Sequence, residues 1–394
     1  MSTNKIPKIR FKGFTEEWEN RKLENLAEFS KGKGYSKSDL IEKGNPIILY
    51  GNLYTNYQTV IKEVHTYAKL NSNVFLSKGN EVIIPSSGET AEDIVRASKV
   101  EKPNIILGGD LNIIIPNEKL DSTFLALNIS NGRTYNKLIK KAQGKSVVHI
   151  RNSDLQETSI LYPSSKTEQT KIGSFFENID QLVNQHQTQH KKLTALKKAM
   201  LSKLFPKQGK KIPEIRFKGF NEEWEVKKLG EIVKIKKGEQ LNKIDMIKNG
   251  NFPVINGGIS PSGYTDKWNT PKNTITISEG GNSCGFINYI KSSFWSGGHC
   301  YTLTIENKEI KKELIYHILK KNENNIMDLR VGSGLPNIQR KPLEDYIINI
   351  PKDKKEQEKI GNYFQNLDSL IANHSQQLEK LEVLKKACLA KMFV

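Results

Sequence analysis

The chain has 394 residues, of which 36% are hydrophobic and 8% aromatic, and its formal net charge is +18 at pH 7. This length suits two domains of ordinary size better than one core, and the apolar content excludes wholesale disorder. No apolar run approaches the roughly eighteen residues of a membrane span, and the polar amino terminus lacks the apolar core of a signal peptide. We therefore expect a cytoplasmic protein.

The positive charge is spread along the chain and does not form a basic tail. A distributed surplus favours an extended surface that follows a nucleic-acid backbone, although lysine-rich proteins can also be basic without binding DNA. The three cysteines form no CxxC pair, which agrees with a reducing compartment and with packing roles. They are Cys284, Cys300 and Cys388.

Two segments of the chain occur twice. Residues 6–23 and 212–229 are identical at 14 of 18 positions, and residues 166–205 and 354–393 match at 21 of 40 positions. The segments between them differ strongly. A duplicated frame with unequal inserts is typical of a protein that reads two different things at a fixed separation, so we expect the inserts to determine specificity.

The inserts predict an α+β fold with two strand-rich, mixed α/β domains. In the first insert we expect strands at 46–50, 81–85, 104–107 and 111–115, and a helix over 122–141. In the second we expect strands at 253–258, 273–278 and 301–305, and a helix over 309–321. Paired glycines lead into a strand in each insert and place Asp110 and His299 at matched positions, where a turn role is favoured.

The matched carboxyl-terminal segments predict two long helices, each of about 35 residues and roughly 50 Å. Apolar residues recur four and three residues apart, as in the seam of a coiled coil. The first seam is Ile172, Phe176, Ile179, Val183, His186, His190 and Leu193, and the second is Ile360, Phe364, Leu367, Ile371, His374, Leu378 and Leu381. Beyond Leu193 and Leu381 the apolar positions move to Leu196, Met200 and Leu204, and to Leu384, Cys388 and Met392, which predicts a slip in phase.

The simplest partner for each apolar stripe is the other helix. If each insert has its termini close together, the helices pair antiparallel within one chain and give a pseudo-two-fold, duplicated arrangement. His186 and His374 occupy the same seam position. A residue that sets the register is the favoured interpretation, and a metal pair or a pH switch is the alternative.

Basic and aromatic residues near glycine-rich turns and helix ends are candidates for contacts to DNA, because lysine and arginine hold phosphates while side chains in the major groove read base edges. The polar turns 86–90 and 279–283 could also supply base-reading groups or could cap strands. The candidates in the first insert are Lys31, Lys33, Tyr35, Arg133, Lys140 and Lys141, and those in the second are Lys236, Lys237, Tyr264, Arg330 and Arg340.

The whole chain resembles the specificity subunit of type I restriction-modification systems. The resemblance rests on the Pro-x-Ile-Arg-Phe-x-Gly-Phe-x-x-Glu-Trp openings at Pro7 and Pro213 and on the Glu-Gln-x-Lys-Ile-Gly motifs that begin at Glu168 and Glu356. The loop 332–338, Gly-Ser-Gly-Leu-Pro-Asn-Ile, also looks like the family, whereas loop 144–150 departs from it. The resemblance implies target-recognition domains at 1–165 and 206–353, a central conserved helix at 166–205 and a carboxyl-terminal conserved helix at 354–394.

The resemblance also implies a role without catalysis. The family's subunit binds double-stranded DNA, scaffolds two methyltransferase (modification) subunits and recruits restriction/translocase subunits. S-adenosylmethionine, ATP and Mg²⁺ are expected on those partners, and no cofactor, no metal and no membrane are expected for this chain. The target would be asymmetric and split, with half-sites about one to one and a half DNA turns apart.

The sequence itself lacks the signatures of the partner enzymes. It has no Asp/Asn-Pro-Pro-Tyr/Phe tetrapeptide for a flipped adenine, and Gly144-Lys145-Ser146 lacks the first glycine of a phosphate-binding loop because Ile139 stands there. Two rival classes remain open. One is a free-standing restriction or methylating enzyme with an undetected site, and the other is a duplicated adaptor that binds proteins.

Overall fold

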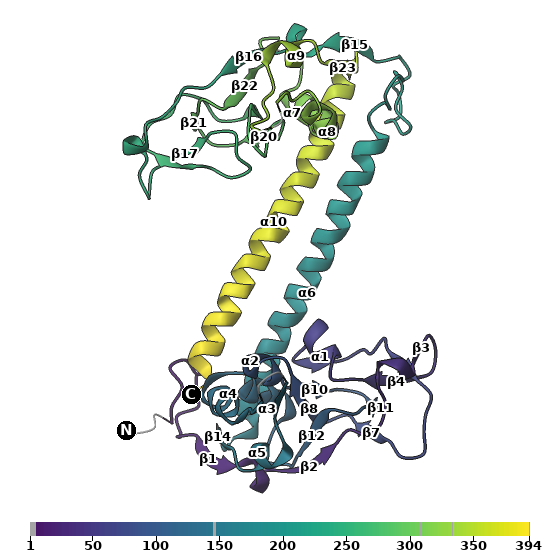
Figure 1. Ribbon diagram of the computed structural model, residues 1–394, viewed down its shortest axis with the longest axis vertical. Coiled ribbons are helices and arrows are strands. Elements are labelled where there is room, and N and C mark those ends of the chain that lie inside the picture. Colours follow the sequence, from purple (N-terminus) through teal and green to yellow (C-terminus); the bar gives the residue numbers. More distant parts are fainter. Residues whose placement is uncertain (1–4, 145–146, 308, 333, 394) are drawn as a thin grey trace. The chain divides into compact units, whose positions relative to one another are not determined.

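A computed structural model describes residues 5–144, 147–307, 309–332 and 334–393. It divides into two compact units, of which the first combines the described parts of Met1–Gln187 and Gln376–Val394 and the second is Thr188–Ser375. The two long helices, α6 (Lys166–Lys203) and α10 (Lys354–Met392), each contribute one part to both units (Figure 1). The domain limits at 165, 205 and 353 stay a prediction.

In the first unit, the described strands form two five-stranded sheets with the orders β2-β12-β8-β10-β5 and β3-β6-β4-β11-β7, and two ribbons, β1-β14 and β13-β9. Four short helices cover the sheets and a fifth, α5, follows β13 (Figure 1). The bounds are β1 Glu19–Lys22, β2 Ala27–Lys31, β3 Leu40–Ile41, β4 Asn45–Ile48, α1 Asn52–Thr55, β5 Val60–Ile61, β6 Tyr67–Ala68, β7 Phe75–Lys78, β8 Val82–Pro85, β9 Ser87–Gly88, α2 Ala91–Ile94, β10 Ser98–Val100, β11 Pro103–Leu107, β12 Leu111–Pro116, α3 Ser122–Ile129, α4 Gly132–Lys141, β13 Val148–His149, α5 Asn152–Gln156 and β14 Ser159–Tyr162.

The second unit repeats this plan with fewer strands. Its described sheets have the orders β16-β22-β19-β20 and β18-β17-β21, and β15 pairs with β23 as β1 pairs with β14. The bounds are β15 Glu225–Lys228, β16 Lys234–Lys237, β17 Phe252–Ile255, β18 Gly263–Thr265, β19 Thr274–Ser278, β20 Ile287–Ile290, β21 Trp295–Ser296, β22 Cys300–Thr304, α7 Lys312–Lys321, α8 Glu323–Met327, α9 Arg340–Glu344 and β23 Ile347–Ile350. Short 3-10 turns follow β1 and β15 at Leu23–Asn25 and Leu229–Glu231.

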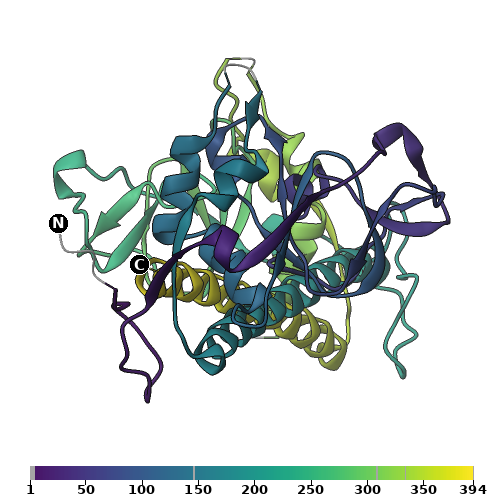
Figure 2. The same ribbon diagram turned by 90° about the horizontal axis from the view of Figure 1, so that it is seen from below.

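The predicted strands are confirmed within one or two residues at their ends, because β-branched runs bounded by Gly, Asn and Pro leave little freedom in assignment. The exception is the strand expected at 253–258, which ends three residues early, at Ile255. The helix expected over 122–141 was wrong in one respect, since it divides into α3 and α4. Gly132 begins α4 with φ +64°, and a Cβ there would lie 2.9 Å from the backbone oxygen of Phe393. The carboxyl end of α10, marked C in Figures 1 and 2, is therefore packed closely on this junction.

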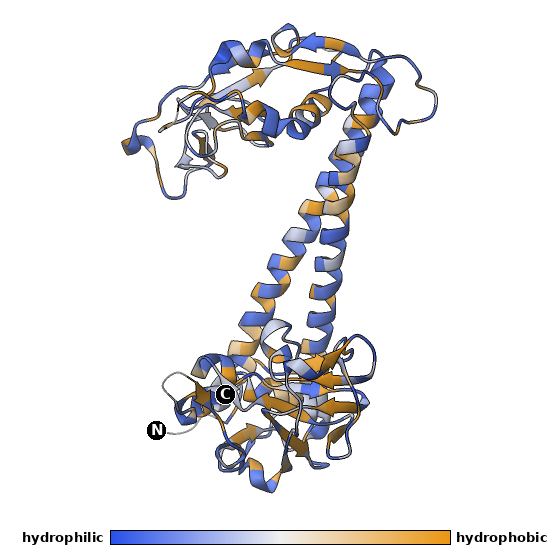
Figure 3. Ribbon diagram, turned by 45° about the vertical axis from the view of Figure 1, so that its right-hand side comes forward, coloured by the Kyte–Doolittle hydropathy of each residue, from blue (hydrophilic) through white to orange (hydrophobic). Residues whose placement is uncertain are grey.

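An aromatic core joins the repeated opening segment to the long helices in each unit. In the first, Trp18 packs edge-on against Phe124, and Phe393 lies 6.0 Å from Phe176 between ring centroids. In the second, Phe205 lies 6.0 Å from Trp224 and stacks on Phe364 at 5.5 Å. All of these side chains are buried, and Figure 3 shows hydrophobic residues gathered in the strands around them.

A buried ion pair repeats in the duplicated frame, by which we mean the opening segments 6–23 and 212–229 and the helical segments 166–205 and 354–393. Arg10 donates two hydrogen bonds to Glu168, at 2.6 and 2.8 Å, and Arg216 does the same to Glu356, at 2.7 and 2.8 Å. The two carboxylates are 1% and 0% exposed. Hydrogen bonds to these carboxylates raise the pKa of both guanidinium groups. The arginine and glutamate of the repeated motifs therefore fasten each opening segment to the start of a long helix.

The long helices pair antiparallel. Within the first unit, Lys385 near the end of α10 pairs with Asp180 in the first half of α6. Within the second unit, Lys197 near the end of α6 pairs with Asp368 in the first half of α10. The start of each helix thus meets the end of the other. The first seam residues, Ile172, Phe176, Ile179, Ile360, Phe364 and Leu367, are buried, and the next ones, Val183, His186, Leu193, Ile371, His374 and Leu381, are half-buried.

The predicted slip in phase was wrong. Leu196 and Leu384 are 41% and 45% exposed, whereas the side chains of Lys197 and Lys385 are only 19% and 27% exposed. The four-and-three spacing continues through these lysines to Met200 and Leu204, and to Cys388 and Met392. A lysine can hold a seam position because its aliphatic stem packs along the apolar stripe while its ammonium group reaches a carboxylate at the edge. The sequence pattern hid this because lysine counts as polar.

Candidate nucleic-acid interface

In each unit, two glycine turns cross at the edge of the main sheet. A Cβ on Gly32 would lie 1.8 Å from the backbone oxygen of Gly108, and a Cβ on Gly238 would lie 2.3 Å from that of Gly297. The same backbone bonds close both crossings, since Gly32 N donates to Leu111 O at 2.9 Å and Gly238 N to Cys300 O at 2.8 Å. Only glycine permits this approach, which explains why residues 32 and 238 are both glycine.

Two further segments complete what we call the loop cluster of each unit. In the first, Ser86 N donates to Asp110 O at 2.7 Å, and Ile150 N donates to Ser86 O at 3.2 Å. In the second, Glu279 N donates to His299 O at 2.9 Å, and Ile338 N donates to Glu279 O at 2.8 Å. The first loop cluster is 31–35, 86–90, 108–110, 144 and 147–150, and the second is 236–240, 279–283, 297–299, 332 and 334–338.

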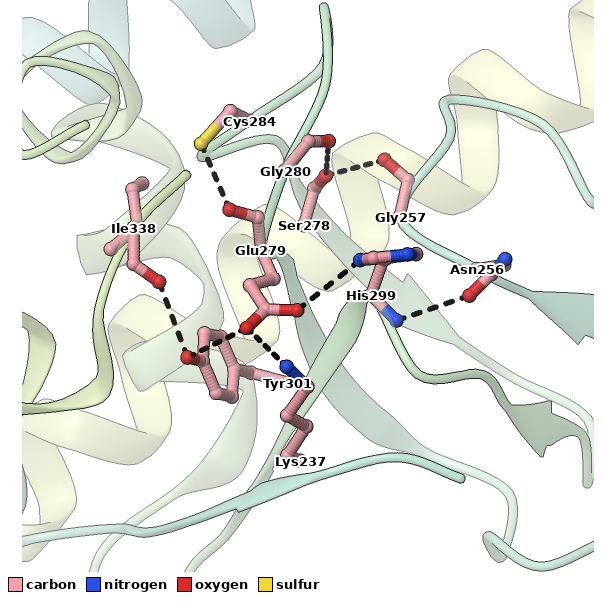
Figure 4. A network of polar contacts seen from close by, with 10 residues as sticks. All are labelled: Lys237, Asn256, Gly257, Ser278, Glu279, Gly280, Cys284, His299, Tyr301 and Ile338. Carbon is pink, nitrogen blue, oxygen red and sulfur yellow. Dashed lines mark hydrogen bonds and ion pairs between the residues drawn. The ribbon is translucent and has the colours of Figure 1, made fainter. Parts of the chain in front are cut away.

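The side chains on this shared backbone differ. Glu279 is the centre of a polar network in the second loop cluster (Figure 4), where its carboxylate is 13% exposed. Lys237 Nζ donates to Glu279 Oε1 at 2.5 Å, and His299 Nδ1 lies 3.4 Å from Glu279 Oε2. Tyr301 Oη lies 3.4 Å from Glu279 Oε1 and 3.2 Å from Ile338 O. The first loop cluster has Ser86 and Asp110 in place of Glu279 and His299, with Ser86 Oγ 3.4 Å from Asp110 Oδ1.

Burial keeps the reactive groups near this network protonated. Desolvation, together with the charge of Glu279, raises the pKa of Tyr301 to about 12. Desolvation likewise raises the pKa of the Cys284 thiol, and it raises the pKa of Cys300 to about 11. A buried thiol is a weak nucleophile, because the thiolate is the reactive form. The three cysteines are buried and free, which confirms the expected packing roles.

Several predicted residues of the second insert lie around the Glu279 network. Lys237 belongs to it directly, and Lys236 is its exposed neighbour on β16. The positive charge of Arg340 opposes the rise in the pKa of Tyr301, and that of Arg330 opposes the rise in the pKa of Cys284. Arg340 also pairs with Glu344 at 2.6 Å. Tyr264 lies elsewhere, on β18 of the three-stranded sheet, with 44% of its surface exposed.

The candidates of the first insert form two separate groups. Lys31 is the last residue of β2, and Lys33 and Tyr35 follow it. Lys33 donates to Asn73 at 3.1 Å, and the Tyr35 hydroxyl donates to Lys69 O at 2.7 Å and accepts from Asn71 N. Tyr35 packs on a small hydrophobic cluster, so its side chain is occupied in the fold. Arg133, Lys140 and Lys141 lie on α4, where Lys141 pairs with Glu157 at 3.1 Å. Arg133 adjoins Gly132 and thus the end of α10.

The sequence interpretation missed the Glu279 network as a unit. The matched glycine pairs align Asp110 with His299, and the sequence identifies 279–283 as a polar turn. Nothing in the sequence, however, pairs Glu279 with Lys237. At the tips of loops 144–150 and 332–338, Val147 and Leu335 are 50% and 85% exposed. Lys145, Ser146 and Ser333 of the same loops lie outside the described residues.

Neither a metal site nor a membrane span emerges from the described residues. In the part of the chain that the structure covers, no three His, Cys, Asp or Glu side chains gather closely enough to hold a metal ion. None of its helices combines the length and apolar character that crossing a bilayer requires.

Comparisons with known proteins converge on one family. The family model of the type I restriction modification DNA specificity domain matches residues 15–195 and 221–383. A putative type I specificity subunit of Mycoplasma pneumoniae is 33% identical over 174 residues, and one of Mycoplasma genitalium is 30% identical over the same length. The match covers 44% of this chain and 46% and 45% of those relatives, so it spans about half of their length.

A solved structure shows the same fold. The S subunit of a type I restriction-modification system from M. genitalium superposes with a TM-score of 0.73 at 21% identity, over 99% of each chain. The twice-matched family model covers both units and both helix motifs. The chain belongs to the type I restriction modification DNA specificity family.

Proposed function

We propose that this chain is the sequence-specific DNA-recognition subunit of a type I restriction-modification complex and reads an asymmetric, bipartite target. The observation that carries the proposal is the contrast between two duplicated parts of the chain, the frame and the loop clusters. The frame repeats contact for contact, as in the pairs Arg10–Glu168 and Arg216–Glu356, whereas the loop clusters share only their backbone bonds. Two alike scaffolds with unlike side chains suit two different half-sites.

In this proposal, residues 1–165 and 206–353 are the recognition domains and the helices are the spacer. Helices of 38 and 39 residues would be about 57 and 58 Å long at 1.5 Å per residue. One DNA turn is about 34 to 36 Å, so half-sites read near the two ends of such a spacer would lie about one and a half turns apart. The charge of +18 supplies the attraction to phosphates.

The chain itself would carry no catalytic step. It would act in the cytoplasm and hold two modification subunits, which bring S-adenosylmethionine, and restriction subunits, which bring ATP and Mg²⁺. The raised pKa values of the Cys284 thiol and the Tyr301 phenol are compatible with this division of work, because both groups stay protonated, which is the less nucleophilic form.

Mapping of methylated adenines tests the proposal directly. A genome that carries this gene with its modification genes should show one split, asymmetric methylated motif, and deletion of this gene alone should remove it. Purified full-length chain should bind duplexes with that motif selectively, and its affinity should fall steeply as salt rises. Methyl transfer by the chain alone, or loss of the gene without any change in methylation, would contradict the proposal.

The spacer is tested by length. Seven residues added to each helix at matched points keep the four-and-three spacing and lengthen each helix by about 10 Å. The gap of unread bases should widen by about three base pairs at 3.4 Å each, while both half-sites keep their letters. Altered letters in either half-site would rule out a spacer role. As a matched control, replacement of residues 24–143 by another insert should change the letters of one half-site and leave the gap unchanged.

A further inference from the structure

The turn after each glycine pair carries one exposed side chain on a fixed backbone. Asn256 Oδ1 accepts from His299 N at 3.1 Å, and His299 O accepts from Glu279 N at 2.9 Å. A Cβ on Gly257 would lie 2.5 Å from His299 O, so the neighbouring turn also fits closely. The His299 side chain nevertheless is 64% exposed. A rigid main chain with an exposed side chain suits a residue that must meet a ligand in one orientation.

Glu279 orients the imidazole of His299. Its Oε2 atom is buried and has no hydrogen bond among the described residues, and His299 Nδ1 lies 3.4 Å from it (Figure 4). A carboxylate beside Nδ1 favours the tautomer with the hydrogen on that atom, which leaves Nε2 as a hydrogen-bond acceptor. Lys237 Nζ donates to the other oxygen of the carboxylate, Oε1, at 2.5 Å, so Oε2 is the oxygen that faces His299.

Asp110 occupies the same place in the first loop cluster. Its backbone oxygen accepts from Ser86 N, as that of His299 accepts from Glu279 N, and its side chain is exposed. Asp110 adopts φ +59°, a conformation that aspartate tolerates better than most residues. An ionised carboxylate only accepts hydrogen bonds. The two loop clusters therefore hold different side chains that can both accept hydrogen bonds, at positions that share a backbone hydrogen bond and differ in φ.

The geometry points to His299 and Asp110 as base-reading residues, each accepting a hydrogen bond from an exocyclic amino group in the major groove. Such groups are N6 of adenine and N4 of cytosine, and no other major-groove edge atom donates. Glu279 is then the positioning residue for His299, and Ser86 is its smaller counterpart beside Asp110. This inference rests on the proposed function and names the chemistry that each loop cluster recognises.

Base analogues test the inference with the full-length chain. The target is first selected from random duplexes, and each adenine or cytosine of the second half-site is then replaced by purine or 2-pyrimidinone, which lack the amino group. One replacement should weaken binding by the wild type about 10- to 100-fold. His299→Ala should weaken binding to the parent duplex by a similar factor. The variant should then bind the parent duplex and the duplex with that replacement equally well. Asp110→Ala is the matched control and should show the same behaviour only in the first half-site.

Three outcomes decide between the possibilities. If His299→Ala responds to every amino deletion as the wild type does, or if it loses instead a wild-type response to replacement of guanine by 7-deazaguanine, which lacks the N7 acceptor, the inference is overturned. Glu279→Gln keeps the size of the side chain but no longer fixes the orientation of His299. An intermediate loss of discrimination between the parent and the amino-deleted duplex in this variant supports the inference. A wild-type chain that selects no sequence at all would overturn the proposed function itself, which separates the two failures.

Discussion

The frame and the loop clusters have been duplicated together but are held by different kinds of interaction. In the frame, buried side chains contact one another, as Arg216 and Glu356 do, so a change in one partner leaves the other unsatisfied. In the loop clusters, backbone hydrogen bonds and closely packed glycines hold the structure together. His299 and Asp110 can thus occupy matched positions. The exposed side chains at these positions can therefore change without a cost to the fold.

The largest effect is expected when the buried arginine of the frame is replaced. Arg216→Ala should lower the free energy of unfolding of the second unit by about 3–5 kcal/mol, because Glu356 would remain buried without its partner. Arg10→Ala should have an equal effect in the first unit through Glu168. Denaturant unfolding measures both. The paired change of Arg216→Met with Glu356→Leu should restore most of the loss, and a loss below about 1 kcal/mol for either single variant would contradict the frame's dependence on this pair.

A second test uses a place where the buried cores of the two units differ. His317 on α7 is 1% exposed and its Nδ1 has no hydrogen bond among the described residues, whereas the corresponding residue on α3 is Leu127. The correspondence follows from matched helix starts, where Lys311 N and Asp121 N each donate to a glutamine of a long helix. Desolvation, with a smaller contribution from Lys197, lowers the pKa of His317 to about 3.

Because the unfolded chain binds a proton at His317 more readily than the folded chain, stability should fall as the pH drops from about 6.5 toward 3. The slope should approach about 1.4 kcal/mol per pH unit, reduced by Asp368, whose carboxylate lies 3.8 Å from Nε2. His317→Leu should remove this part of the pH dependence. Denaturant unfolding at pH 7 and pH 5 measures it, and equal slopes in both proteins would mean that His317 is protonated alike in the folded and unfolded chains.

The sequence was sufficient where one pattern has one physical meaning. The duplication, the strands beside Gly108 and Gly297 and the antiparallel helices followed from identity, β-propensity and chain connection. It was insufficient where a side chain has two uses. Lys197 can be a surface residue or a seam residue, and Tyr35 can bind a ligand or pack on a core. The Glu279 network was not predictable, since its partners lie 42 and 20 residues away in sequence and only the sheet brings them together.

A third and smaller effect is expected for the lysines of the helix seam. Lys197→Ala removes both an aliphatic stem from the stripe and an ion pair with Asp368, whose side chain is 27% exposed. We expect a loss of about 1 kcal/mol, because solvent screens such a half-exposed pair. Lys385→Ala should lose a similar amount through Asp180. Lys197→Met keeps the stem, so the difference between the Met and Ala variants, measured by denaturant unfolding, separates packing from charge.

The smallest effect is expected at the neighbouring leucines, and it distinguishes the two phases of the helix pair. Leu196 and Leu384 are 41% and 45% exposed, so Leu196→Ser and Leu384→Ser should each change the free energy of unfolding by no more than about 0.5 kcal/mol. If the seam instead slipped onto these residues, each substitution would remove a core side chain and cost about 2–5 kcal/mol. A leucine that matters less than the lysine beside it is a result that hydropathy alone would not predict.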